Sequence, residues 1–225
     1  MREKRTVLFD LDGTIIDSMA GITHAYQYAL AHFGVRVEDP AALARFVGPS
    51  LYHTFADEYR FQGADLQTAV AKYREYFSEK GVFEHTLYPG MAALIRHLSE
   101  QGRTLAVASC KVAVYTNQIL DQYGLLDCFA FVGGSEMDGR RSDKAEIIRH
   151  VLAGLGSPAP DTAVMVGDRA EDVAGARAAG IDGVGVLYGF GGRAELDAAG
   201  ATALVADVPA LASLLGASIS SGGLE

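Results

Sequence analysis

The chain is poor in cysteine, in positive charge and in long apolar stretches. Its 225 residues include two cysteines, Cys110 and Cys128, which lie in different predicted segments and lack the paired spacing of a zinc site. This argues against a disulfide framework and for a reducing compartment. Lysine and arginine number 19 against 28 acidic residues, a formal net charge of −9. Such a balance disfavours a protein that tracks a nucleic-acid polymer, but a metal ion and a few placed cations could still hold a small anion.

The apolar segments are too short for a membrane span. The first of them is broken by Asp10, which also makes it too short and too acidic for the apolar part of a signal peptide. We therefore expect a soluble cytoplasmic protein with no membrane partner. The sequence shows no internal repeat and leaves the oligomeric state open between monomer and homodimer.

Short apolar runs alternate with amphipathic segments over most of the chain. Runs that are apolar at nearly every position are typical of strands buried on both faces of a parallel sheet. Strands in alternation with helices predict βαβ units, hence an α/β fold with a doubly wound, Rossmann-like parallel sheet. The expected strands are Thr6–Phe9, Thr104–Ala108, Phe129–Val132, Ala163–Val166 and Gly183–Leu187, and the expected helices are Met91–Gln101, Val112–Tyr123, Asp143–Leu155 and Ala170–Ala179.

One segment interrupts the alternation directly after the first strand. Residues 18–85 contain no convincing buried strand and are divided by glycine and proline turn signals into several expected helices. This predicts a helical domain inserted into an α/β core that comprises residues 1–17 and 86–217. The Ser/Gly-rich residues 218–225 are expected to form a flexible tail.

The first strand ends in an acidic motif, Asp10-Leu11-Asp12-Gly13-Thr14. Two carboxylates at the end of a buried strand are costly to desolvate, and a divalent cation relieves that cost. Ligand sites in open α/β sheets lie at the carboxyl ends of the strands, so the position is suitable. An ordinary turn accounts for Asp12-Gly13 but not for Asp10.

Two further segments carry polar residues that suit an anion. Ser109 directly follows the second expected strand and is expected to lead into a helix, where a hydroxyl and free backbone N–H groups face an anion. A plain N-cap serine is the alternative. Lys144 opens a predicted helix, where a cation opposes the helix dipole unless it faces an anion. A solvated surface lysine is the alternative there.

The fourth strand also runs into acidic residues. Asp168 follows the strand, and Asp172 lies four residues later in the first turn of the next helix. The alternative interpretation is helix capping by Asp168 with a favourable dipole interaction of Asp172, and it does not exclude metal binding.

Taken in order, these four segments resemble the motifs of the haloacid dehalogenase-like (HAD) superfamily. The similarity to its phosphatase branch extends from Thr6 to about Leu215, and the inserted helices correspond to the family's cap domain. Within the superfamily the chain is most similar to phosphoglycolate-phosphatase-like and 5′-nucleotidase-like members. Two stretches support this, Phe46-Val47-Gly48-Pro49-Ser50-Leu51 and Gly185-Val186-Leu187-Tyr188-Gly189.

The resemblance implies an Mg²⁺-dependent phosphomonoester hydrolase with an aspartyl-phosphate intermediate. Asp10 is then the nucleophile, and Asp12 protonates the leaving oxygen and later activates water. Mg²⁺ is expected on the carboxylates of Asp10 and Asp168 and on the backbone carbonyl of Asp12. The substrate phosphate is expected to meet Ser109, Lys144, the backbone of Cys110 and the loop braced by Thr14, with Asp172 orienting Lys144 or a metal-bound water.

One residue departs from the family pattern. Cys110 stands where such enzymes more often have Asn or Ser, and a thiol at a helix N-terminus is expected to be unusually acidic and oxidisable.

Several alternatives remain at this point. A phosphomutase of the same superfamily shares the Asp10 and Asp12 pattern, whereas a dehalogenase suits Lys144 and Asp168 less well. A phospho-receiver or non-catalytic binding module has a similar α/β fold, but the helical insertion counts against the former. The expected partner is a small phosphorylated metabolite, phosphoglycolate or a nucleoside 5′-monophosphate. Its leaving group is expected to be recognised by cap residues, for which the candidates are Arg45, Gly48-Pro49-Ser50, Tyr52 and His53.

Overall fold

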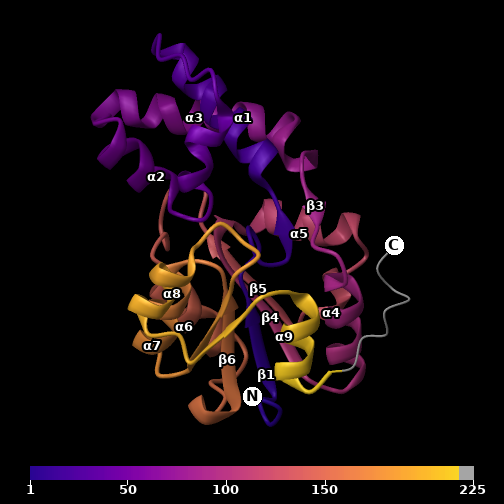
Figure 1. Cartoon of the computed structure of the whole chain (residues 1–225). Helices are drawn as coiled ribbons and strands as arrows, with labels where there is room; N and C mark the ends of the chain where they lie inside the picture. The colour runs from indigo at the N-terminus through magenta and orange to yellow at the C-terminus, as the bar shows by residue number, and fades with distance from the viewer. Residues whose placement is uncertain (218–225) are drawn as a thin grey trace. The chain divides into compact units, whose positions relative to one another are not determined.

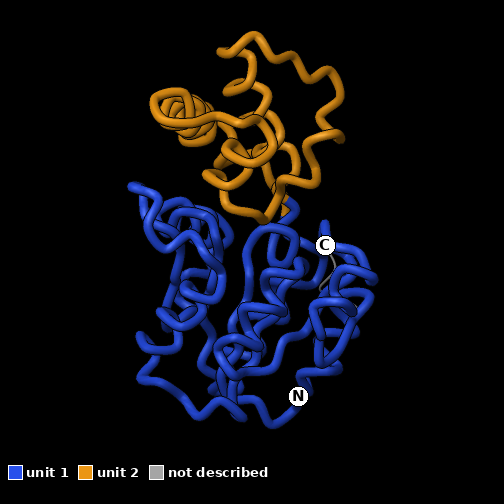
Figure 2. The backbone as a smooth tube through the Cα atoms, turned by 90° about the vertical axis from the view of Figure 1, so that its left-hand side faces the viewer, with its two compact units in different colours: residues 1–17, 87–225 blue, residues 18–86 orange. Residues whose placement is uncertain are grey.

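The chain folds into two compact units. The computed structural model describes residues 1–217, so the stretch 218–225, expected as a flexible tail, lies outside the described residues. One unit comprises Met1–Asp17 and the chain from Leu87 onward, and the other comprises Ser18–Thr86 (Figure 2). The helical segment thus ends at residue 86, one residue beyond the end expected from the sequence. Below, the first is called the α/β unit and the second the helical unit.

A six-stranded sheet forms the centre of the α/β unit, and every paired strand in it is parallel to its neighbour. This confirms the predicted α/β class. The spatial order is β5-β4-β1-β6-β7-β8. The strands are β1 (Thr6–Phe9), β4 (Thr104–Val112), β5 (Phe131–Ser135), β6 (Ala163–Gly167), β7 (Asp182–Val186) and β8 (Ala203–Val205).

Strand β1 lies between β4 and β6, and all four of its residues are buried. Phe9 pairs with Val107 of β4 and with Val166 of β6, so these three strands reach the same edge of the sheet together. The chain leaves β1 toward β4 on one side and later returns to β6 on the other. That reversal is the position at which open α/β sheets bind ligands.

Helices cover both faces of the sheet (Figure 1). In that view α6, α7 and α8 lie on one side and α4 and α9 on the other. A buried apolar cluster joins β1, β4 and β6 to α6 and α7, with Leu8, Met165 and Ile148 among its members. The helices are α4 (Met91–Glu100), α5 (Ala113–Gln122), α6 (Lys144–Gly154), α7 (Ala170–Ala178), α8 (Arg193–Ala199) and α9 (Val208–Leu215).

The strands differ from prediction where polar residues continue a strand or where a strand is short. Strand β4 runs on through the polar stretch Ser109–Lys111 to Val112, so the predicted end at Ala108 was four residues too early. Strand β8 was not predicted because its apolar run of three residues is too short to stand out. A separate two-stranded sheet, β2 (Ile16–Asp17) and β3 (Thr86–Leu87), forms where the chain passes between the units.

The helical unit has an aromatic interior. Tyr26 of α1 is 1% exposed and packs with ring-centroid distances of 5.0 to 5.6 Å against Phe46, Phe55 and Tyr73. Within residues 1–217, no helix is both long enough and apolar enough to span a bilayer. The elements of this unit are α1 (Met19–His32), the 3₁₀ helix Pro40–Phe46, α2 (Leu51–His53), the π-helical Thr54–Glu58, α3 (Gly63–Glu79) and the 3₁₀ turn Gly81–Phe83.

Candidate active site

Both acidic residues of the first motif are buried at the end of β1. Asp10 is 3% exposed and Asp12 is 5% exposed. The backbone N–H of Asp10 donates to Val166 O of β6 at 2.8 Å, which extends the sheet pairing by one residue. The loop then turns back through N–H groups of residues 14–16 that all donate to Leu11 O. The backbone that carries the two carboxylates is therefore fixed by hydrogen bonds.

Lys144 lies at the centre of a charged cluster. Its Nζ contacts Asp10 Oδ1 at 2.8 Å, Asp172 Oδ1 at 2.7 Å and the carbonyl oxygen of Ala108 at 3.0 Å. Burial acts to lower the pKa of Lys144, but the two carboxylates outweigh it and hold that pKa well above its ordinary value. Asp143 caps α6 by accepting from the N–H of Glu146, and this cap starts the helix at Lys144. Lys144 is thus a buried ion-pair partner and not a surface lysine.

Asp168 follows β6 and is fully buried. Its Oδ2 accepts from the backbone N–H of Phe190 at 2.7 Å, while its Oδ1 has no hydrogen-bond partner among residues 1–217. Burial, with Asp172 and Asp10 nearby, raises the pKa of Asp168 well above its ordinary value. An oxygen left without a donor in so acidic a place is suited to a cation.

Glycines make room for the Asp168 carboxylate. A Cβ on Gly13, which has φ +84°, would stand 2.2 Å from Asp168 Oδ2. A Cβ on Gly189 would stand 2.4 Å from both Asp168 Cβ and Gly13 O, and one on Gly191 would stand 1.9 Å from Asp168 O. The loop after β7 therefore wraps around Asp168 in a way that only glycine permits at these positions.

Asp172 lies in the first turn of α7 and joins the same cluster. Its Oδ2 accepts from the backbone N–H of Arg169, the residue that caps α7, and its Oδ1 pairs with Lys144. The capping role that the sequence offered for Asp168 therefore belongs to Arg169 and Asp172 instead.

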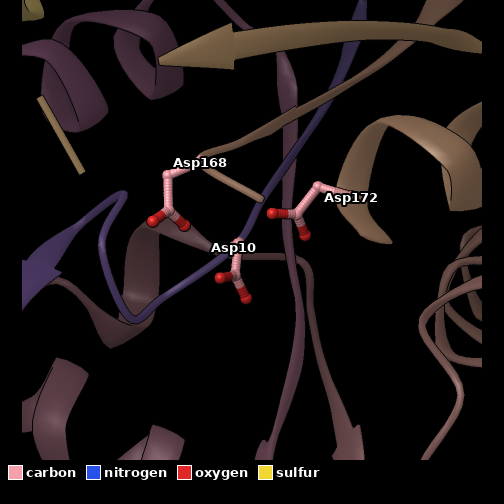
Figure 3. Close-up of side chains that lie close together, drawn as sticks. All are labelled: Asp10, Asp168 and Asp172. Carbon is pink, nitrogen blue, oxygen red and sulfur yellow. The ribbon is translucent and has the colours of Figure 1, made fainter. Parts of the chain in front are cut away.

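Three carboxylates converge at this edge of the sheet (Figure 3). One oxygen each of Asp10, Asp168 and Asp172 lies within 4.8 Å of the others, and all three residues are buried. Burial raises the pKa of Asp10 to about 7; Asp172 and Asp12 add to the rise, and Lys144 opposes it. Lys144 pairs with two of these three buried carboxylates, Asp10 and Asp172. The negative charge left over favours a bound metal cation.

The second motif contains two differences from expectation. Ser109 is 1% exposed and its Oγ accepts from Lys111 N at 3.2 Å, but the N-cap of α5 is Val112. Ser109 therefore does not lead into a helix N-terminus, because β4 continues past it. For the same reason the expectation of an acidic Cys110 thiol is wrong. Cys110 lies within β4, and burial raises the pKa of its thiol to about 12.

Thr14 is fully buried, and its Oγ1 has no hydrogen-bond partner in the described part of the chain. The loop is braced instead through its backbone, since Thr14 O accepts from the Tyr188 hydroxyl at 3.1 Å. The structure thus connects the loop after β1 to the loop after β7.

Lys111 is a site residue that sequence reasoning missed. Its Nζ lies 3.0 Å from Asp12 Oδ2, and both side chains are 7% exposed. The signal available was its place next to Cys110 at the end of a buried strand, but a single lysine at such a position ordinarily indicates a surface.

The residues expected to recognise the leaving group of the substrate all lie in the helical unit. Arg45 is exposed and forms a 3.0 Å ion pair with Glu58. Ser50 is 7% exposed, and its Oγ has no hydrogen-bond partner within residues 1–217. Tyr52 and His53 belong to α2, and Gly48 has φ +104°.

Comparison with known proteins agrees with this geometry. Residues 7–186 match the model of the family described as haloacid dehalogenase-like hydrolase. The chain is 40% identical over 209 residues to a 5′-nucleotidase of Pseudomonas aeruginosa, covering 93% of this chain and 94% of that one. It is 33% identical to a phosphoglycolate phosphatase of Rhodospirillum rubrum, covering 94% and 91%.

Two further similarities concern other relatives. The tyrosine-protein kinase PtkA of Mycobacterium tuberculosis is 37% identical over 82% of this chain and 62% of its own length. The crystal structure of a predicted phosphatase from Clostridium acetobutylicum superposes with a TM-score of 0.91 at 41% identity, covering 93% of this chain and 97% of that one.

Proposed function

Since the chain belongs to the haloacid dehalogenase-like hydrolase family and is a phosphatase of that family, we propose that it hydrolyses small phosphomonoesters with Mg²⁺ through an aspartyl phosphate on Asp10. The observation that carries this proposal is the buried group of Asp10, Asp168 and Asp172, two of which, Asp10 and Asp172, pair with Lys144. The proposed nucleophile, Asp10, is thus buried beside a cation and two further carboxylates.

The donor set fits Mg²⁺, which prefers oxygen ligands. Asp10 and Asp168 would hold the ion, together with the backbone carbonyl of Asp12. The unpartnered Oδ1 of Asp168 and the raised pKa values of Asp10 and Asp168 support this, because a cation supplies the charge that these groups lack. When bound, the ion polarises the phosphoryl group and offsets negative charge in the transition state.

The residues of the chain then carry the reaction in two steps. In the first, the Asp10 carboxylate attacks phosphorus, the bond to the leaving oxygen breaks, and the proton of Asp12 goes to that oxygen. In the second, water gives a proton to Asp12 and attacks phosphorus, which frees Asp10 and releases phosphate. Lys144 offsets charge on the phosphoryl oxygens, aided by Ser109, and Asp172 keeps Lys144 in place.

The substrate is proposed to be phosphoglycolate or a nucleoside 5′-monophosphate, because two relatives carry those activities in their names. The helical unit is proposed to act as the cap that recognises the leaving group. All phosphate-handling residues belong to the α/β unit, which leaves Arg45, Ser50 and their neighbours in the helical unit for this role.

The test is phosphate release from a panel of phosphomonoesters, with Mg²⁺ and with chelator. We expect turnover with Mg²⁺, its loss in chelator, and poor replacement by Ca²⁺, which takes more ligands at longer distances. Full activity in chelator would remove the metal from the proposal. Transfer to a sugar phosphate or to tyrosine, with no phosphate released, would instead indicate a mutase or a kinase.

A further inference from the structure

Lys111 is a second buried lysine, distinct in its partners from Lys144. It lies at the end of β4, and its Nζ is 3.0 Å from Asp12 Oδ2. Lys144 contacts Asp10 and Asp172 instead. The two lysines therefore serve different carboxylates, and a lysine with a 7% exposed side chain needs a partner to offset its desolvation.

The two oxygens of Asp12 are in different environments. Oδ2 contacts Lys111, whereas Oδ1 is buried and has no hydrogen-bond partner within residues 1–217. A lysine ammonium group has three donors and no acceptor, so an oxygen that faces it must accept. A proton carried by Asp12 therefore sits on Oδ1. The ion pair also fixes the terminal torsion of Asp12, which is otherwise broad and two-fold.

We propose that Lys111 is a positioning residue that holds Asp12 with Oδ1 as its proton-carrying oxygen. This rests on the proposed function, in which Asp12 protonates the leaving group. As the bond from phosphorus to the leaving oxygen breaks, the proton on Oδ1 moves to that oxygen. The rate of this step depends on where Oδ1 lies, and Lys111 fixes that position through the opposite oxygen.

The test compares two leaving groups of nearly equal shape. 4-Nitrophenolate leaves readily without a proton, whereas phenolate is more basic and needs one. The quantity to measure is kcat/KM, because it covers the steps through release of the leaving group and excludes the later attack by water. Lys111→Met should reduce kcat/KM for phenyl phosphate by about tenfold or more beyond its effect on 4-nitrophenyl phosphate.

Controls separate positioning from damage to the protein. The ratio of the two substrates within one variant does not depend on the folded fraction, because unfolded molecules lower both activities alike. Lys80→Met, which removes an exposed lysine, should leave that ratio unchanged. Lys111→Arg keeps a hydrogen-bond donor, so its kcat/KM ratio for the two substrates should lie between those of wild type and Lys111→Met. In an Asp12→Asn background, Lys111→Met should not change the ratio further, since the proton donor is already gone.

Equal losses for both phosphates in Lys111→Met would overturn the inference and show that Lys111 binds the phosphoryl group or supports the fold. A further change of the ratio in the Asp12→Asn background would overturn it as well. Failure of the proposed function looks different, since the wild-type protein then releases no phosphate from either compound.

Discussion

The interiors of the two units differ in kind. Among the described residues, every buried charged side chain belongs to the α/β unit. The buried polar residues of the helical unit are uncharged, and its core is built from aromatic rings around Tyr26. The buried charges are Asp10, Asp12, Lys111, Lys144, Asp168 and Asp172, and the buried polar residues of the helical unit are Ser18, Thr23, Ser50 and Thr54.

This difference indicates which unit carries the groups for catalysis at a cost in folding free energy. Burying a charge costs free energy, and the α/β unit buries six charged side chains at the carboxyl edge of its sheet. The helical unit is held by apolar packing, which tolerates change at its surface. We therefore expect chemistry and metal binding to depend on the α/β unit, and substrate choice to depend on the helical unit.

The largest effect is expected from Asp10→Asn, which removes the proposed nucleophile and preserves its shape. Phosphate release should fall by at least about a thousandfold, since no other group can form the covalent intermediate. In chelator at pH 8 the same variant should melt at a higher temperature than wild type, because one carboxylate fewer is buried beside Asp168 and Asp172.

The matched control for Asp10→Asn is Asp138→Asn, which changes an exposed aspartate paired with Arg140. It should leave activity and the chelator melting temperature nearly unchanged. Asp10→Asn activity within tenfold of wild type would contradict the covalent mechanism.

The next effect concerns the glycine loop that holds Asp168. Gly189→Ala places a Cβ 2.4 Å from Asp168 Cβ and from Gly13 O, so the carboxylate must shift. Metal affinity should fall by about 10- to 100-fold, as when the support of a metal ligand is removed. Calorimetry or Mn²⁺ spin resonance measures it, and Gly192→Ala is the control, since nothing lies within 4 Å of its added Cβ. Equal affinities in the two variants would remove this loop from the metal site.

Metal binding should also depend on pH. Burial raises the pKa of Asp10 from 3.8 to about 7, so below pH 7 an ion must displace a proton there. Mg²⁺ affinity should therefore rise between pH 6 and pH 8, by up to about tenfold per unit for each proton displaced. Titration calorimetry at several pH values measures it. An affinity that is flat over this range would show that Asp10 is already ionised without metal.

The same shift has a consequence for stability without metal. Between pH 3.8 and about 7 the folded state binds more protons at Asp10 than the unfolded state does. The contribution of Asp10 to the free energy of unfolding therefore falls as pH rises through this window. Asp10→Asn should remove that part of the pH dependence when melting is followed in chelator. An unchanged pH dependence would contradict the raised pKa.

The smallest effect is expected in the helical unit. Arg45→Ala removes an exposed ion pair with Glu58, which contributes little to stability. It should change the kcat/KM ratio of a nucleoside 5′-monophosphate to 4-nitrophenyl phosphate by a few-fold to about tenfold. Ser50→Ala should act similarly, while Ser109→Ala in the α/β unit should lower kcat/KM by the same factor for every substrate. The reverse pattern, in which Ser109→Ala reorders substrates and the helical-unit variants do not, would refute this division.

The sequence predicted five of the six strands in the sheet because each contains a short run of mainly apolar residues. Strand β1 has the expected bounds, and β6 differs by one residue. It also predicted Asp10, Asp168 and Lys144 as site candidates, because charged residues directly after buried strands or at a helix start are unusual. The structure brings these residues together with Asp172.

Other features had no local signal. Lys111 contacts Asp12, which lies in the loop after β1 and far away in sequence, so nothing in the segment of Lys111 indicated a partner. Gly189 and Gly191 matter because a side chain at either position would clash with Asp168. That clash is visible only in the folded structure, where the loop lies against Asp168. The acidity expected of Cys110 was wrong because β4 continues past it, so that the thiol lies in a strand and not at a helix end.

The central claim, a phosphoryl group carried on Asp10, is tested most directly by trapping it. A saturating pulse of 4-nitrophenyl phosphate with Mg²⁺ is quenched in acid within the first turnover, and the peptides are mapped by mass spectrometry. The account predicts one phosphoryl group on the peptide that contains Asp10, removable by hydroxylamine as an acyl phosphate, and none in Asp10→Asn. A phosphoryl group on a peptide without Asp10, such as the one containing Ser109, would contradict it.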